Sequence, residues 1–244
     1  MRLILALLLA GAAQAQVAPS DRVLPRSTLP GIGGEDRRAP VDAAALPWAA
    51  LGRVQTELGG RCTGVLIAPD RVLTAAHCLL SRGTGQMVQP GSVHFLQGFS
   101  RGGYTGHARV AGFSVGEGWD ATRRGPVGAD WAVLRLSQRL PGATVPLWQG
   151  DLPAGAAVML GGYQQDRAEV LLADTACTVL GRARDTAGAA LVAHGCTATR
   201  GASGAPLLLV LPGGRFAVAG VSSVMELGAA RGFAVPAEAI GAVP

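Results

Sequence analysis

Residues 206–222 read PLLLVLPGGRFAVAGVS, which is two apolar runs separated by Pro212-Gly213-Gly214. Pro and Gly between two apolar runs of strand length are typical of a hairpin loop. The stretch therefore predicts two antiparallel strands, Pro206–Leu211 and Phe216–Ser222.

Short apolar runs of the same kind, broken by Gly, Pro and Asp, continue along the chain from Leu46 onward. One connection, Ala68-Pro69-Asp70-Arg71, is a turn in which Pro fixes φ and Asp caps the backbone. Helical periodicity is scarce, so the sequence predicts an all-β sandwich or barrel, with Pro141-Gly142 as a hinge between two halves. The other predicted strands are Thr63–Ile67, Val72–Ala76, Val93–Phe99, His107–Val115, Trp131–Leu136, Ala157–Gly161, Glu169–Ala173 and Ala190–His194.

The composition is that of a folded protein. Of the 244 residues, 49% are hydrophobic and 15% are charged, which supports a core and excludes a disordered chain. The formal net charge is +5, and all 21 basic residues are Arg. A phosphate-binding surface needs basic residues gathered on one face, whereas only Arg37-Arg38 and Arg123-Arg124 are adjacent here. We therefore expect no nucleic-acid partner.

Residues 1–15 have the features of a secretory signal peptide. The basic start Met1-Arg2 precedes an apolar run from Leu3 to Ala13, and Ala13-Gln14-Ala15 has small residues where a signal peptidase reads them. The run is well short of the roughly 20 residues that a membrane-spanning helix needs. We therefore expect cleavage after Ala15, a secreted or periplasmic protein, and no stable membrane anchor.

Residues 16–40 contain Pro, Ser, Arg and a Gly-Ile-Gly-Gly stretch, without an apolar period. This composition is typical of a pro-segment or a flexible arm. The basic pair Arg37-Arg38 offers a cleavage site for its removal. The segment 41–244 then remains as the folded domain.

Four cysteines, Cys62, Cys78, Cys177 and Cys196, are expected to form two disulfides in a secreted chain. Three connectivities are open. Pairing near neighbours, Cys62 with Cys78 and Cys177 with Cys196, closes two short loops, each of which stabilises the fold by about 3 kcal/mol. A zinc site is the rival interpretation, but the chain has no C-x-x-C pair and no His at ligand spacing, so we expect no metal ligands.

Three short segments contain residues that are suited to catalysis. Residues 73–78 read LTAAHC and place His77 at the end of a predicted strand; residues 128–134 read GADWAVL and place Asp130 before another. Residues 201–206 read GASGAP and place Ser203 in a Gly-rich turn. Taken singly, each has an ordinary interpretation: a structural His, a turn acid and a loop Ser.

Together, the three segments resemble the trypsin/chymotrypsin-like serine proteases over residues 41–244, including the bacterial glutamyl-endopeptidase-like members. The order His77, Asp130, Ser203 is that of this family and differs from subtilisins and α/β-hydrolases. The resemblance implies two packed six-stranded antiparallel β-barrels, at about 41–140 and 141–244, with the active site in the cleft between them. The pair Cys62 and Cys78 also looks like the disulfide that this family has beside its catalytic His.

The resemblance further implies a secreted serine endopeptidase that acts on protein or peptide substrates. Ser203 is the expected nucleophile, His77 the general base, and Asp130 the residue that orients His77. The main-chain N–H groups of Gly201 and Ser203 are expected to form the oxyanion hole. This chemistry requires no cofactor, and we expect a monomer.

One position departs from the trypsin pattern. Most trypsin-like zymogens have an Asp directly before the serine, which pairs with a new N-terminal amine after cleavage, whereas this chain has Ala202. We therefore expect the oxyanion turn to be preformed or held by other contacts.

The expected substrate-binding residues are Thr197, Arg200, Ser222, Ser223 and Met225. Thr197 occupies the position where trypsins carry an Asp, so a substrate Arg or Lys would be buried without a partner, which is costly. Arg200 either lies at the rim and favours an acidic residue or is a solvated loop residue. Met225 is expected to narrow the pocket, which favours small or medium uncharged side chains.

Three other functions are compatible with parts of the sequence. A catalytically silent homologue would be a binding or regulatory protein on the same scaffold, although His77, Asp130 and Ser203 are all present. A basic protein that binds acidic surfaces would need none of these residues. An esterase would share the serine chemistry, but Ala205 replaces the last Gly of a G-x-S-x-G motif.

Overall fold

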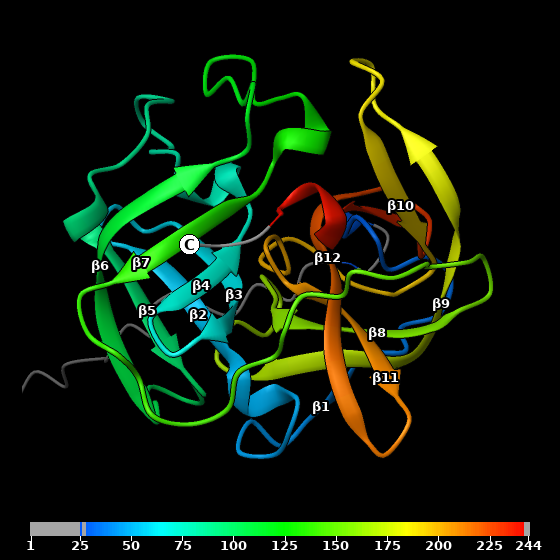
Figure 1. Cartoon of the computed structure of the whole chain (residues 1–244), viewed down its shortest axis with the longest axis horizontal. Coiled ribbons are helices and arrows are strands. Elements are labelled where there is room, and N and C mark those ends of the chain that lie inside the picture. The colour runs from blue at the N-terminus through cyan, green and yellow to red at the C-terminus, as the bar shows by residue number, and fades with distance from the viewer. Residues whose placement is uncertain (1–24, 26–27, 242–244) are drawn as a thin grey trace, which may run out of the picture.

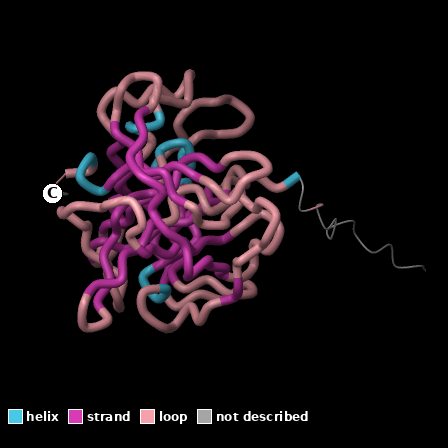
Figure 2. The backbone as a smooth tube through the Cα atoms, turned by 90° about the vertical axis from the view of Figure 1, so that its right-hand side faces the viewer, coloured by secondary structure: helices cyan, strands magenta, loops and turns pink. Residues whose placement is uncertain are grey.

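The computed structural model describes residue 25 and residues 28–241, and it contains thirteen strands and short 3-10 turns (Figure 1). The expected signal peptide, residues 1–15, lies outside the described residues. Within the described residues there is no α-helix, and none of the helical turns is long and apolar enough to cross a membrane. Figure 2 shows loops surrounding a centre that consists almost entirely of strands.

Six antiparallel strands close the first barrel in the order β2-β3-β4-β7-β6-β5, because β2 also pairs with β5. Its interior is filled by the buried side chains of Val54, Leu66, Phe95 and Leu134. The strands are β2 (Leu51–Thr56), β3 (Arg61–Ala68), β4 (Arg71–Thr74), β5 (Val93–Gln97), β6 (Gly106–Val115) and β7 (Ala132–Leu136).

The second barrel has the strand order β9-β10-β13-β12-β11-β8, and the antiparallel pairing of β8 with β9 closes it. Leu160, Val192, Leu207 and Ala234 lie in its core. The predicted hairpin joins β11 to β12, with Leu211 opposite Arg215. The strands are β8 (Ala157–Tyr163), β9 (Leu171–Arg184), β10 (Ala190–His194), β11 (Pro206–Leu211), β12 (Arg215–Met225) and β13 (Gly232–Pro236).

A third group of buried residues packs the two barrels against each other. It includes Leu51 and Val65 from the first barrel and Tyr163, Leu208 and Val218 from the second. The chain crosses between the barrels through residues 137–156, which contain the predicted hinge Pro141-Gly142. The expectation of an all-β fold with two six-stranded barrels is confirmed.

The described part of the expected arm, residues 28–40, packs against the second barrel. Leu29 and Ile32 are buried, and strand β1 (Ala39–Pro40) pairs with β9. Two disulfides join near neighbours in the sequence. Cys62–Cys78 lies in the first barrel, with an S–S distance of 2.03 Å, and Cys177–Cys196 in the second, with 2.05 Å.

Candidate active site

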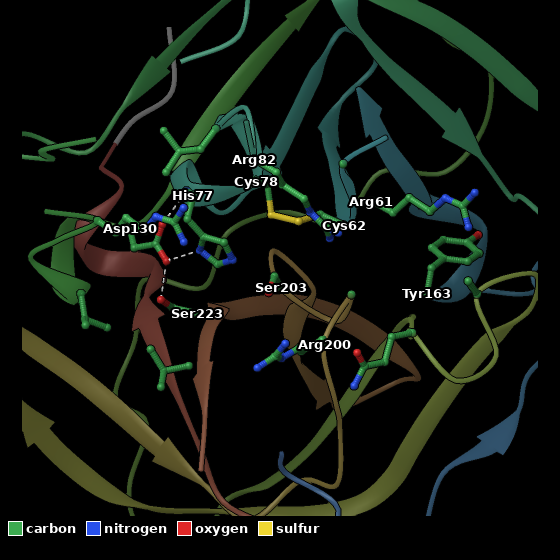
Figure 3. Close-up of a pocket in the computed structure, with 18 residues that line it drawn as sticks. Arg61, Cys62, His77, Cys78, Arg82, Asp130, Tyr163, Arg200, Ser203 and Ser223 are labelled. Atoms are coloured by element: carbon green, nitrogen blue, oxygen red, sulfur yellow. Dashed lines mark hydrogen bonds and ion pairs between the residues drawn. A yellow bond between two sulfur atoms is a disulfide. The ribbon is translucent and has the colours of Figure 1, made fainter. Parts of the chain in front are cut away.

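A cleft of about 750 Å³ is lined by residues of both barrels, and His77, Asp130 and Ser203 all line it (Figure 3). His77 belongs to the 3-10 turn Ala76–Leu79 that follows β4. Asp130 caps the C-terminal end of the 3-10 turn Val127–Ala129, two residues before β7 begins. Ser203 lies in the connection between β10 and β11. The fold thus brings together three residues that are far apart in the sequence.

Local packing fixes the position of His77. Ala75 and Ala76, which precede it, are fully buried. Cys78, which follows it, is tied to β3 by the disulfide with Cys62. The imidazole of His77 is therefore open toward the cleft, and the His77 side chain is 29% exposed.

Asp130 holds His77 through both of its carboxylate oxygens. Oδ1 accepts a hydrogen bond of 2.9 Å from the main-chain N–H of His77, and Oδ2 lies 2.6 Å from His77 Nδ1. Ser223 Oγ donates a further hydrogen bond to Oδ2. Burial alone would raise the pKa of Asp130, but the hydrogen bonds from His77 and Ser223 outweigh it and lower the pKa. An ionised Asp130 keeps the proton on His77 Nδ1 and leaves Nε2 available as a base.

The turn around Ser203 leaves two main-chain donors free. Ala202 N–H donates to Thr199 O, at 3.0 Å, whereas neither Gly201 N–H nor Ser203 N–H has an acceptor among the described residues. Gly201 has φ +95°, and a Cβ there would lie 2.2 Å from Tyr163 O, so only glycine fits. Two unpaired N–H groups beside a serine hydroxyl can stabilise an oxyanion.

The Ser203 hydroxyl and the His77 ring line the same cleft but are not hydrogen-bonded to each other. A long contact between nucleophile and base is common in a free enzyme and shortens when substrate binds.

Thr63 on β3 contacts the turn that contains Ser203, which the sequence did not predict. Its N–H donates to Ser203 O at 2.9 Å, and its Oγ1 donates to Gly201 O at 2.9 Å. The same Oγ1 accepts a hydrogen bond from Tyr163 N–H. Thr63 therefore ties the loop that contains Ser203, in the second barrel, to the first barrel. Nothing in the sequence distinguishes it from other strand threonines.

The five expected substrate-binding residues lie in different places. Arg200 and Ser223 line the cleft, and Ser223 also holds Asp130. Thr197 and Ser222 are buried, and neither is in the cleft lining. Met225 is likewise outside the lining.

Met225 is wedged between two glycines. A Cβ on Gly232 would lie 2.4 Å from Met225 Sδ, and a Cβ on Gly31 would lie 2.5 Å from Met225 Cε. The thioether therefore fills the space between Gly31 and Gly232.

The cleft is strongly cationic. Arg61, Arg82, Arg124 and Arg200 line it, and their side chains make no ion pair or hydrogen bond with any residue from 28 to 241. Asp130 is the acidic residue in the lining, and it is buried and paired with His77. Figure 3 shows Arg61 and Arg82 on the side of the Cys62–Cys78 disulfide, with Arg200 across the cleft from them.

One group in the site has the residue types of a metal centre. The ligand atoms of Cys62, His77 and Cys78 lie within 4.8 Å of one another. The two sulfur atoms are bonded to each other, so they are not available as the thiolates that bind zinc.

Three comparisons with known proteins bear on the family and the fold. The sequence profile of the trypsin-like peptidase domain matches residues 62–215. A glutamyl endopeptidase of Bacillus licheniformis is 27% identical over 141 residues, which are 56% of this chain and 42% of that protein, so the chain spans less than half of that curated relative. A solved structure of a Glu endopeptidase in complex with MPD superposes with a TM-score of 0.67 and 20% identity, over 86% of this chain and 95% of that one.

Proposed function

The chain belongs to the trypsin-like peptidase family, and we propose that it is a serine endopeptidase that works through His77, Asp130 and Ser203. The observation that carries the proposal is the arrangement in one cleft: a His77 ring held by an ionised carboxylate beside a serine whose turn leaves two N–H groups free.

In the proposed mechanism, Ser203 Oγ attacks the carbonyl carbon of the scissile peptide bond while His77 Nε2 takes the hydroxyl proton. The carbonyl oxygen becomes negative and accepts hydrogen bonds from the N–H groups of Gly201 and Ser203. His77 then gives its proton to the leaving amine, and an acyl-enzyme forms on Ser203. Water, activated by the same His77, hydrolyses this ester and restores the enzyme.

We further propose that the cleft disfavours Arg or Lys at P1, the residue on the amino side of the scissile bond, and that it favours substrates with acidic residues. The four arginines that line the cleft have no carboxylate partner among residues 28–241, so they repel a cationic peptide and attract an acidic one. Two relatives are glutamyl endopeptidases by name, which agrees with an acidic preference.

The cellular context follows from the sequence. We propose that residues 1–15 are a signal peptide and that the protein works outside the cytoplasm, in the periplasm or the medium, as a monomer on protein or peptide substrates. The two disulfides fit such an oxidising compartment.

Peptide-library profiling of the purified chain and of Ser203→Ala tests the function. We expect cleavage by the native chain and none by Ser203→Ala. Peptides with Glu beside the cleavage site should be cut several-fold faster than the matched Gln peptides, and the ratio should fall as NaCl is raised. A native chain without turnover would instead indicate the catalytically silent homologue, and equal rates for the Glu and Gln peptides would refute the acidic preference.

A further inference from the structure

Residues 28–40, here called the N-terminal strap, contact the segment that directly precedes the oxyanion turn. Three consecutive main-chain N–H groups, those of Thr197, Ala198 and Thr199, are each held by the strap, either directly or through one buried side chain. Each of the three contacts starts from a different residue of the strap.

The first contact runs through Arg37 and Asp174. Arg37 Nη2 lies 2.9 Å from Asp174 Oδ2, and the same oxygen accepts a hydrogen bond of 2.8 Å from Thr197 N–H. Asp174 is 1% exposed, so Arg37 supplies the charge that this buried carboxylate needs. Arg37 also donates to Gly195 O at 2.6 Å. Both ends of the 195–197 stretch are thus connected to one strap residue.

The second contact is direct. Gly31 O accepts a hydrogen bond of 3.1 Å from Ala198 N–H, and Gly31 N–H donates to Glu226 O at 2.6 Å. Gly31 has φ +78°, and a Cβ there would lie 2.0 Å from Ala198 O. The approach of the two backbones therefore requires glycine.

The third contact runs through Arg38 and Gln164. Arg38 Nη1 donates to Gln164 Oε1 at 2.8 Å, and this oxygen also accepts a hydrogen bond of 2.7 Å from Thr199 N–H. Arg38 is buried and is held by the carboxylates of Asp36 and Asp166, each through two of its nitrogens. Gln164 is fully buried, so its amide oxygen depends on these two donors.

Thr199 connects these contacts to the catalytic turn. Its O accepts the N–H of Ala202, the bond that closes the turn and leaves the N–H groups of Gly201 and Ser203 free. A shift of Thr199 would therefore redirect both donors. Ala202 has no side chain that could hold the turn by an ion pair.

We propose that the N-terminal strap is a permanent part of the active enzyme that positions the oxyanion turn, with Arg37 and Arg38 as positioning residues. The inference rests on the proposed function. It assigns to Arg38 and Gln164 the task that an ion pair to the residue before the serine performs in most trypsins. It also places the mature N-terminus before Gly31, the first strap residue that makes one of the three contacts, because cleavage after Arg38 would remove all of them.

The variants Arg38→Gln and Gln164→Met interrupt the same contact at two points. We expect each to lower kcat on a peptide substrate by about tenfold or more, because small displacements of catalytic donors are costly, with a smaller change in KM. The affinity for a peptide trifluoromethyl ketone, whose oxyanion uses the same donors, should fall in parallel. The pH profile should stay unchanged, because the contact between His77 and Asp130 is not touched.

The double variant should lose no more activity than the worse single variant, since both act on one contact. Arg182→Gln is the matched control: it removes another ion-paired arginine of the second barrel, bonded to Glu238 at 2.6 Å, and should retain full activity. Arg38→Lys keeps the positive charge but lacks the planar guanidinium that binds two carboxylates at once, so we expect an intermediate kcat.

Folded Arg38→Gln and Gln164→Met enzymes with native kcat and native affinity for the ketone would overturn the inference. The inference would also be overturned if N-terminal sequencing of the active enzyme showed that the mature chain begins after Arg38. This measurement needs no variant. Failure of the proposed function looks different, because the native chain itself would then show neither turnover nor ketone binding.

Discussion

His77 and Asp130 are joined by two hydrogen bonds, from the main-chain nitrogen of His77 to Oδ1 at 2.9 Å and between Nδ1 and Oδ2 at 2.6 Å. The carboxylate therefore fixes both the backbone and the ring of the proposed base. With Ser223 as an additional donor to Oδ2, Asp130 has little freedom to turn.

Replacing Asp130 with Asn should lower kcat by about 10⁴-fold at neutral pH, because the amide stabilises the wrong tautomer of His77. Steady-state hydrolysis of a peptide anilide measures the effect. Asp42→Asn, at an exposed turn acid outside the cleft, should be unaffected. A loss of less than tenfold in Asp130→Asn would mean that Asp130 does not orient the base.

Gly201→Ala should lower kcat by about 10²- to 10³-fold, the cost of losing an oxyanion donor, since the new Cβ would lie 2.2 Å from Tyr163 O. Gly188→Ala is a matched control: Gly188 has φ +85°, close to the +95° of Gly201, but open space around it. Circular dichroism and peptide kinetics compare the two. If Gly188→Ala lost as much activity as Gly201→Ala, backbone strain alone would explain the loss.

Met225→Ala should enlarge the space beside Gly232 that the thioether now fills. We expect kcat/KM for peptides with Phe or Leu at P1 to rise about tenfold relative to Ala at P1, as each added methylene group finds room. Met159→Ala, on β8 and packed against the core between the barrels rather than against Gly232, is the control. An unchanged ratio would show that P1 side chains bind elsewhere.

His194 predicts a pH dependence of stability. Burial lowers its pKa to about 4, below the value of about 6.5 in an unfolded chain. The unfolded chain therefore takes up a proton first, so stability is complete above pH 6.5 and falls as the pH drops from about 6.5 to about 4. In urea unfolding, protonation of His194 in the unfolded chain should lower the free energy of unfolding by about 2 kcal/mol between pH 7.5 and pH 5.

His194→Asn should lack this part of the loss, because its amide oxygen still accepts the Cys196 N–H that His194 Nδ1 accepts at 3.3 Å but does not titrate. Parallel loss of stability in the native chain and the variant would contradict the assignment.

Local sequence signals predicted the framework of the molecule. The Pro212–Gly214 hairpin and the Pro69-Asp70 turn are present as expected, because their residues determine the backbone conformation. Strand β2 was missed because Gly52 and Arg53 interrupt its apolar pattern. Glycine is required at position 52 by a contact in the folded barrel, because a Cβ there would lie 2.4 Å from the Phe95 ring.

The site was only partly predictable for the same reason. His77, Asp130 and Ser203 stand in recognisable short motifs, and the fold places them in one cleft. The contacts that hold the proposed oxyanion turn join residues 35 to 138 positions apart, through Thr63, Gln164 and Arg38, and depend on the packing of the barrels. The composition of residues 16–40 predicted a pro-segment or a flexible arm. The burial of Leu29 and Ile32 in its described part depends on the packing of the second barrel, which the local sequence does not show.

Reaction with a fluorophosphonate, followed by mass-spectrometric mapping of the modified residue, tests the proposed catalytic machinery most directly. The reagent forms a stable adduct only with a serine that a neighbouring base activates. We predict one adduct per chain, on Ser203, that forms rapidly in the native protein and is lost in both Ser203→Ala and His77→Ala. No adduct, or an adduct on another residue that persists in these variants, would contradict the account.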